Sequence, residues 1–294
     1  MTERLRWPDD AKGWPNAEAS RFVEAGGLRW HVQAMGAGPV VLLLHGAGAS
    51  THSWRAVAPR LASRFTVIAP DLPGHGFTAE PPPRGATLPG MAAGVGALLR
   101  AIDAAPDIVV GHSAGAAIAL RMALDGLIAP RGVVSFNGAL TPFPGLAGAL
   151  FPQIAKLLFI NPFTPRLFAW RAGDENAVRR VIENTGSRLD DEGVRLYSRL
   201  FRSPGHVAGA LGMMANWDLA PLLRDLPALR TRLTLVVGGA DKAVPPDDAF
   251  RIRDLTPGAV VEVWRGLGHL AHEEEPQRAA DLILAAADSV ASSG

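Results

Sequence analysis

The chain has 294 residues, a length that suits one large domain or a domain with an inserted segment. Its 29 lysines and arginines balance 28 acidic residues, and the net charge of +1 gives no electrostatic reason to expect a nucleic-acid partner. The sequence has no cysteine, which excludes disulfides, thiolate catalysis and iron–sulfur ligation, and its 48% hydrophobic content argues against a disordered chain.

The N-terminal segment 1–19 is polar, and we expect an extended arm pinned by its tryptophans. Residues 1–10 carry charges of both signs and no apolar core, unlike a secretory signal, so a cytoplasmic protein is expected. The longest nearly uncharged stretch, 132–165, is interrupted by prolines and would make a poor membrane-spanning helix. We therefore expect no transmembrane span.

Strand and helix patterns alternate from residue 21 to residue 136. Alternation of apolar and polar residues predicts a hairpin, and continuous apolar runs predict strands that are buried on both faces. Ser53 is the expected N-cap of the first helix. In chain order the predicted elements are a hairpin at 21–33, a strand at 39–44, a helix at 53–62, a strand at 65–69, a helix at 88–102, a strand at 108–110, a helix at 114–124 and a strand at 132–136.

The turn at 111–115 has the pattern Gly-x-Ser-x-Gly between an apolar strand and an apolar helix, which is typical of a nucleophile elbow. Gly111 and Gly115 lack a Cβ, so the strand and the helix can approach each other closely around Ser113. The N–H of Ala114 begins the helix, where unpaired amides attract negative charge. The plain alternative is a glycine-rich turn with a solvated serine.

From residue 140 the alternation stops, and residues 140–217 are predicted to form a helical lid inserted after a strand. The lid divides the core into a first part, 1–139, and a second part, 218–294. It begins with a stretch rich in Phe and Leu, and amphipathic helices follow, the third of them capped by Ser203 before Pro204. The residues expected to share a buried helix face are Val178, Val181 and Ile182, then Val194, Tyr197, Leu200 and Phe201, then Val207, Ala210, Leu211 and Met214.

Strand–helix alternation resumes after the lid. The predicted elements are a strand at 233–237, a helix at 246–255, a strand at 259–264 and a helix at 276–290. Repeated strand–helix units predict an α/β protein with a parallel sheet that is covered by helices on both faces.

Three side chains occupy positions suited to covalent catalysis. Ser113 lies at the elbow, Asp241 follows a strand, and His269 follows the last strand, in the order Ser, acid, His. Sites in open parallel sheets lie beyond the carboxyl ends of strands, where all three fall. Ser113 would attack a carbonyl carbon, His269 would take up and return the proton, and Asp241 would orient the imidazole.

A tetrahedral intermediate needs preorganised hydrogen-bond donors for its oxyanion, each worth about 3 kcal/mol. The N–H of Ala114 is one predicted donor. The N–H of Ala47, in the segment 45–48 that follows an apolar strand, is the other.

Each assignment has an alternative. Asp247 or Asp248 could be the acid, although both suit the start of a helix. His272 competes with His269, and His-x-x-His could suggest a metal, but further ligands are not evident, so neither a metal nor another cofactor is expected. Residues 273–275 are expected to begin a solvated helix.

A substrate pocket is expected between the elbow and the lid. An alternative interpretation is that His45, in the segment 45–48, and His112, beside the elbow, are structural supports. The apolar residues could likewise belong to the hydrophobic core. The segment 71–76 is expected to shape a turn. The predicted pocket residues are His45, His112, Phe143, Leu146, Phe159, Met213, Met214 and Trp217.

Five motifs together resemble the α/β-hydrolase superfamily over about residues 21–290. They are His-Gly-Ala-Gly at 45–48, Asp-Leu-Pro-Gly-His-Gly at 71–76, Gly-His-Ser-Ala-Gly at 111–115, Gly-Ala-Asp at 239–241 and Gly-Leu-Gly-His at 266–269. The resemblance implies a mostly parallel eight-stranded sheet flanked by helices, an inserted helical lid and esterase-like serine hydrolase chemistry. Serine at the elbow disfavours the haloalkane dehalogenase and epoxide hydrolase branches, which use aspartate there.

Further segments resemble the BchO family, the magnesium-chelatase accessory proteins of bacteriochlorophyll biosynthesis. These segments are 14–16, 19–23, 51–55, 137–140, 201–204 and 213–218. The resemblance implies a role in a photosynthetic bacterium near magnesium insertion into protoporphyrin IX. The implied partners are an apolar small molecule such as a tetrapyrrole, and chelatase subunits. The alternatives are a noncatalytic accessory that binds porphyrin or a chelatase subunit, and a weak peripheral membrane contact through 143–170.

Overall fold

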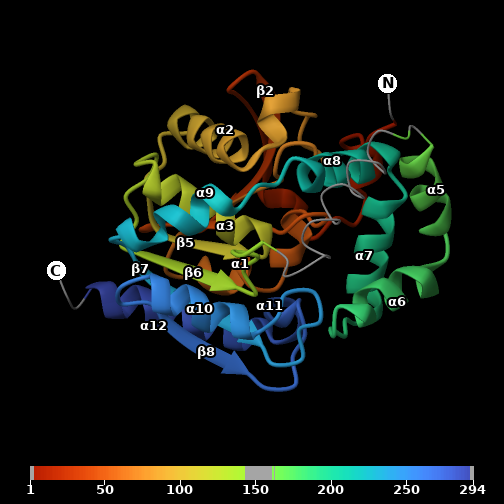
Figure 1. Cartoon of the computed structure of the whole chain (residues 1–294). Helices are drawn as coiled ribbons and strands as arrows, with labels where there is room; N and C mark the ends of the chain where they lie inside the picture. Colours follow the sequence, from red (N-terminus) through yellow and green to blue (C-terminus); the bar gives the residue numbers. More distant parts are fainter. Residues whose placement is uncertain (1–2, 143–160, 162, 292–294) are drawn as a thin grey trace.

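The structure, a computed structural model, describes residues 3–142, 161 and 163–291. Helices lie on both sides of a twisted sheet, and a group of helices stands at the end toward which the parallel strands point (Figure 1). In the described part of the chain the sheet has eight strands in the order β1-β2-β4-β3-β5-β6-β7-β8. The predicted α/β class is confirmed.

The strands match the predicted apolar runs to within a few residues. β2 pairs antiparallel with β1 and β4, and every other pairing is parallel, so the sheet is mostly parallel, as the resemblance implied. The strands are β1 (Ser20–Ala25), β2 (Leu28–Met35), β3 (Val40–Leu44), β4 (Thr66–Pro70), β5 (Pro106–His112), β6 (Gly132–Phe136), β7 (Arg232–Gly238) and β8 (Val260–Trp264).

Two helical layers bury the two faces of this sheet. On β3, Leu42 and Leu44 pack into the core cluster that contains α2 and α3, whereas Val41 and Leu43 pack into the cluster that contains α1 and α12. This alternation is the two-residue period of a strand buried on both sides. The layer helices are α1 (Ala58–Leu61), α2 (Leu88–Ala101), α3 (Ala114–Leu124), α9 (Ala220–Asp225), α10 (Asp247–Leu255), α11 (Ala271–Glu274) and α12 (Pro276–Ala291).

Helices α5 to α8 separate β6 from β7, where the sequence predicts an inserted lid. Ser203 caps α8 as predicted, because its hydroxyl accepts the N–H of His206. Two details of the predicted buried faces are wrong: Val181 is 54% exposed, and Met213 is buried while Met214 is half-buried. The buried face of α6 is therefore narrower than its apolar stripe, and that of α8 is shifted from Met214 to Met213. The helices are α5 (Thr164–Arg171), α6 (Glu175–Asn184), α7 (Asp191–Phe201) and α8 (Pro204–Ala215).

The N-terminal arm and the first helix differ from expectation. The arm is not extended, because it forms the short 3₁₀ turns η1 (Asp9–Ala11) and η2 (Ala17–Ala19). Its tryptophans do pin it: Trp14 is buried and its Nε1–H donates to Thr51 Oγ1 at 3.3 Å. Ser53 is not an N-cap, since the side chain of Ser50 accepts the N–H of His52 and starts a separate 3₁₀ turn, η3 (Thr51–Trp54).

Two further 3₁₀ turns, η4 (Pro83–Ala86) and η5 (Leu226–Ala228), complete the connections. Within 3–142, 161 and 163–291, no helix is both long enough and apolar enough to cross a lipid bilayer.

Candidate active site

The turn between β5 and α3 holds Ser113 in a strained conformation. Its φ of 51° and ψ of −116° lie outside the regions that L-residues normally adopt. A Cβ at Gly111 would overlap the backbone of Ala116, and a Cβ at Gly115 would overlap the carbonyl oxygen of Leu44. The two glycines therefore allow the close approach of strand and helix that the sequence pattern predicts.

Asp241 and His269 meet at the carboxyl edge of the sheet. Asp241 follows β7, His269 follows β8, and Asp241 Oδ2 lies 2.8 Å from His269 Nδ1. The carboxylate also accepts the N–H groups of Ala243 at 2.8 Å and Val244 at 2.9 Å. Its side chain is 1% exposed, so these donors fix its orientation and aim the imidazole.

Asn137, which the sequence analysis did not assign to the site, is a further partner of Asp241. Its Nδ2–H donates to Asp241 Oδ2 at 2.8 Å and to the carbonyl oxygen of Gly268 at 3.2 Å. Asn137 has a φ of 47°, which asparagine tolerates better than most residues. The sequence does contain a signal for this role, because Asn137 directly follows β6, the strand that pairs with the elbow strand β5.

His112 connects the elbow to the loop that carries His269. Its Nε2–H donates to the carbonyl oxygen of His269 at 2.9 Å, and the two rings lie 4.8 Å apart between centroids. Because His269 Nδ1 donates to Asp241, its Nε2 carries the lone pair. The hydroxyl of Ser113 forms no hydrogen bond with another residue in the described ranges, so the Ser–His contact is not made.

The segment 46–50 runs beside Ser113. A Cβ at Gly46 would lie 2.8 Å from His112 Nδ1 and 3.1 Å from Ser113 Cβ, so the backbone itself touches the elbow. The N–H of Ala47 donates to no other residue in the described part of the chain. Ala114 is the first residue of α3, and its N–H precedes the hydrogen-bond ladder of the helix.

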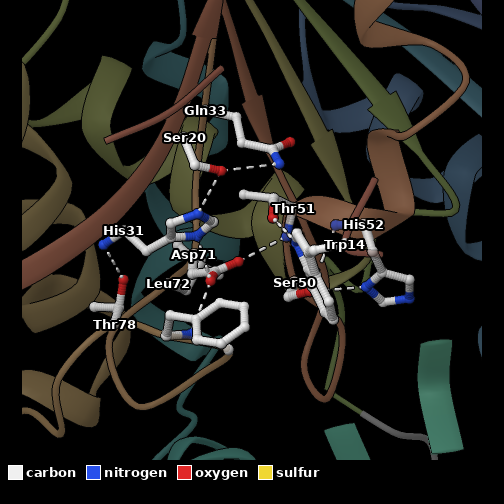
Figure 2. A network of polar contacts seen from close by, with 12 residues as sticks. Trp14, Ser20, His31, Gln33, Ser50, Thr51, His52, Asp71, Leu72 and Thr78 are labelled. Atoms are coloured by element: carbon white, nitrogen blue, oxygen red, sulfur yellow. Dashed lines mark hydrogen bonds and ion pairs between the residues drawn. The ribbon is translucent and has the colours of Figure 1, made fainter. Parts of the chain in front are cut away.

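A buried carboxylate, Asp71, contacts Thr51, the residue that follows this segment (Figure 2). Its Oδ1 accepts the N–H of Thr51 at 2.7 Å, and its Oδ2 lies 2.8 Å from His31 Nδ1 and accepts the N–H of Phe77 at 2.9 Å. Burial alone would raise the pKa of Asp71, but the nearby histidines His31 and His45 and the hydrogen bonds lower it below its usual range. The residue predicted to shape a turn is thus the centre of a polar network.

Most histidines around the site are buried. Burial lowers the pKa of His206 to about 4 and that of His272 to about 3, with neighbouring positive charge acting in the same direction. Burial likewise lowers the pKa of His45 and of His112. These four rings are therefore neutral near pH 7.

Comparison with known proteins identifies the family. The profile of the Alpha/beta hydrolase family matches residues 41–282. The chain belongs to this family. A magnesium-chelatase 30 kDa subunit of Rhodobacter capsulatus is 39% identical over 273 residues, which are 92% of this chain and 95% of the relative.

Two further similarities fit the α/β-hydrolase assignment. A soluble epoxide hydrolase of a Corynebacterium species is 30% identical over 278 residues, covering 88% of this chain and 93% of that protein. A solved α/β-hydrolase fold protein of Burkholderia ambifaria superposes with a TM-score of 0.76 at 21% identity, covering 97% of this chain and all of that one. The latter similarity shows the fold alone.

The predicted pocket residues within the described ranges differ in their burial. The ring of His45 is fully buried and accepts the N–H of Leu72 at 2.8 Å, and His112 is 3% exposed. Met213 is buried, while Met214 and Trp217 are half-buried on the insertion side. The other predicted pocket residues, Phe143, Leu146 and Phe159, lie outside the described residues.

The alternative site residues have other contacts. Asp247 and Asp248 lie in the first turn of α10, and His269 contacts Asp241 instead. The ring of His272 is buried, with Nε2 3.2 Å from Ser53 Oγ. In the described ranges no group of three or more histidine or acidic side chains is arranged to hold a metal ion.

The expected solvated helix at 273–275 is wrong for its first residue. Glu273 is buried, where Arg55 Nη1 donates to it at 2.5 Å and the hydroxyl of Tyr197 donates at 2.7 Å. Burial raises the pKa of Glu273, and Arg55 opposes that shift. A run of three glutamates predicts solvent-exposed side chains. The side chain of Glu273 is buried instead because Arg55 and Tyr197, which are distant in the sequence, donate hydrogen bonds to it.

Proposed function

We propose that this protein is a serine hydrolase that cleaves an ester or a related carbonyl bond of an apolar substrate. Ser113 is the nucleophile, His269 is the general base and acid, and Asp241 orients the imidazole. The observation that carries the proposal is the strained elbow of Ser113, whose neighbour His112 contacts the loop of His269, a histidine whose Nδ1 lies 2.8 Å from Asp241 Oδ2.

The proposed reaction has two stages. Ser113 Oγ attacks the carbonyl carbon as its proton moves to His269 Nε2, and the tetrahedral intermediate then expels the leaving group, which takes that proton. Water hydrolyses the acyl-serine by the same proton route, which restores the Ser113 hydroxyl. Catalytic hydrogen bonds often tighten only when substrate is bound, so the free hydroxyl of Ser113 is compatible with this role.

The proposed oxyanion hole consists of the N–H groups of Ala47 and Ala114. Both flank Ser113, since the backbone of Gly46 contacts its Cβ position and α3 begins directly after it. Backbone donors that are fixed before the reaction lose little energy to reorganisation and stabilise the developing negative charge.

For the substrate and setting we propose a tetrapyrrole at or near the magnesium chelatase step of bacteriochlorophyll biosynthesis, in the cytoplasm of a photosynthetic bacterium. The support is the 39% identity with a magnesium-chelatase 30 kDa subunit over 92% of the chain. Chelatase subunits are the proposed protein partners. The proposed pocket lies beside Met213, which is buried, and Met214 and Trp217, which are half-buried.

Hydrolysis of short activated esters tests the chemistry. We expect turnover by the wild type and a loss of about a thousandfold or more in Ser113→Ala, because the residual catalysis comes from binding and oxyanion stabilisation alone. The matched control is Ser63→Ala, an exposed serine whose replacement should leave the rate unchanged. Folded wild-type protein without turnover on any ester would contradict the proposal.

A second candidate function is a noncatalytic accessory that binds a porphyrin or a chelatase subunit on the hydrolase fold. The observation in its favour is the absence, among the described residues, of a hydrogen bond from the Ser113 hydroxyl to His269. Complementation of a null strain separates the two candidates. Full complementation by Ser113→Ala supports the accessory role, and failure at normal protein level supports catalysis.

We also propose a weak peripheral membrane contact through α5. Phe163, Leu167 and Trp170 follow helical spacing and are 68%, 62% and 75% exposed, which is unusual for residues of this size. Flotation with liposomes measures the contact. Flotation that is unchanged in Leu167→Asp would contradict it.

A further inference from the structure

The imidazole of His206, on α8, lies between two loops of the core. It is buried, its Nε2 lies 3.0 Å from the carbonyl oxygen of Gly48, and its Nδ1 lies 3.0 Å from the backbone nitrogen of Gly76. The N–H of Gly76 can only donate, so Nδ1 must accept. Nε2 therefore carries the proton and donates it to Gly48.

Helix α8 holds this ring in place from the insertion side. The hydroxyl of Ser203 accepts the N–H of His206 at 3.3 Å and caps the helix. One turn later, Gly209 packs directly on Gly74, and a Cβ on Gly209 would overlap the carbonyl oxygen of Gly74. At Gly209, α8 is thus seated on the turn at 71–76 without an intervening side chain.

Gly48 is connected to the proposed oxyanion donor through successive peptide groups. The carbonyl of Gly48 shares a peptide plane with the N–H of Ala49, which donates to the carbonyl oxygen of Gly46 at 3.2 Å. The carbonyl of Gly46 in turn shares a peptide plane with the N–H of Ala47. Each contact restrains the rotation of the next plane, so the position of Gly48 contributes to where the N–H of Ala47 points.

This series of peptide groups is held at a second point, Gly46. The Nε2 of His45 accepts the N–H of Leu72, so Nδ1 carries the proton and donates to the carbonyl oxygen of Gly46 at 2.8 Å. The loop is therefore fixed at Gly46 from the core and at Gly48 from the insertion. Hydrogen bonds in such series strengthen one another.

We propose that His206 is a positioning residue of the active site: through Gly48 and Ala49 it orients the N–H of Ala47 toward the oxyanion. The inference rests on the proposed serine hydrolase function. In this role α8 must stay in place during the reaction, unlike a mobile lid. If α8 moved away, the peptide group of Gly48 would lose its hydrogen bond from His206.

Two substitutions separate the two hydrogen bonds of the ring. In His206→Gln the side-chain amide nitrogen reaches about as far as Nε2 and keeps the donor to Gly48. In His206→Asn the shorter amide keeps an acceptor for Gly76 but loses the donor to Gly48. We expect kcat on activated esters to fall about tenfold in the Asn variant with KM within about twofold, and to stay within about threefold of wild type in the Gln variant.

Equal losses in both variants, an effect on KM alone, or no loss in the Asn variant would overturn the inference. If the wild type has no esterase activity, it is the proposed function that fails, so the two failures are distinguishable. Nitrogen-15 NMR of the wild type then tests the positioning itself. We expect His206 to be protonated at Nε2 and the amide signals of Ala47 and Ala49 to shift in the Asn variant; the opposite tautomer, or unmoved signals, would overturn it.

Discussion

The two sides of Ser113 are built by different means. On one side, the segment 46–51 is held by buried polar side chains, those of Asp71, His45 and His206. On the other side, the side chains of Asn137 and His112 hold the loops of Asp241 and His269 together with close contacts to residues 185–187, which connect α6 to α7 in the insertion. The first side depends on the charge and tautomer of buried side chains, whereas the second combines side-chain hydrogen bonds with close backbone packing at Gly268.

The backbone contacts on the His269 side are specific. The carbonyl oxygen of Thr185 accepts the N–H of Lys242 at 3.0 Å and that of His269 at 3.4 Å. The hydroxyl of Ser187 accepts the N–H of Leu270 at 2.7 Å. A Cβ at Gly268 would overlap the backbone of residues 186–187. The insertion therefore contributes to both sides of the site, through His206 on one and through 185–187 on the other.

The largest expected effect on stability comes from removing the charge of Asp71, which holds the segment 46–51. Asp71→Asn keeps the shape of the side chain but leaves a buried set of donors arranged for a carboxylate. We expect the free energy of unfolding to fall by about 3 to 5 kcal/mol, as when one partner of a buried polar pair is removed. Urea denaturation measures this, and a loss below about 1 kcal/mol would contradict the role given to Asp71.

The close packing of the His269 loop should be disrupted by adding a methyl group at Gly268. In Gly268→Ala the new Cβ meets backbone rather than a flexible side chain, so the loop of His269 must shift. We expect a loss of about 3 kcal/mol in stability and a fall in kcat that exceeds any rise in KM. As a control, Gly258→Ala adds a methyl group with open space around it, although at a positive φ of 76°, and should leave kcat unchanged.

Acid should weaken the contact that His206 makes with the segment 46–51. The pKa of His206 is lowered from 6.5 to about 4, so between these values the unfolded chain binds a proton that the folded chain does not. Above pH 6.5 the titration of His206 therefore leaves the free energy of unfolding unchanged. As the pH falls from 6.5 toward 4, the free energy of unfolding decreases by about 3 kcal/mol in total. Replacing His206 with Gln should flatten this dependence; equal slopes in the two proteins would contradict the assignment.

The smallest effect is expected at Ser187. In Ser187→Ala the buried N–H of Leu270 loses its acceptor, which costs about 1 to 2 kcal/mol. Because Thr185 still holds the neighbouring N–H groups, kcat should fall less than in Gly268→Ala. Thermal denaturation and ester kinetics together check this order, and the reverse order would show that packing is the weaker of the two constraints.

The sequence predicted the parts of the site that are encoded locally. Ser113 directly follows a strand, Asp241 and His269 lie in the loops after strands, and an apolar run followed by a turn is visible in the sequence itself. His206 and Ser187 escaped notice because their partners, Gly48 and Leu270, lie 158 and 83 positions away. A helical pattern shows which face is apolar, but it does not show which loop a single polar side chain will meet.

The same limit explains the errors in the predicted elements. Ser53 looked like an N-cap, but Ser50 is closer to a free N–H and starts its own turn. Glu273 looked solvated because its neighbours are glutamates, yet Arg55 and Tyr197 from other elements neutralise it. The contacts of Glu273 are absent from the local pattern, whereas the error at Ser53 was a choice between two nearby serines, because Ser50 accepts the N–H of His52.

The most direct test of the account is covalent labelling by a fluorophosphonate, followed by peptide mapping. We expect stoichiometric phosphonylation of Ser113, no labelling in Ser113→Ala, and a markedly slower rate in Asp241→Asn, where the imidazole is no longer held in the correct tautomer. Folded wild-type protein that resists the reagent, or that is labelled elsewhere, would contradict the claim that Ser113, His269 and Asp241 act together.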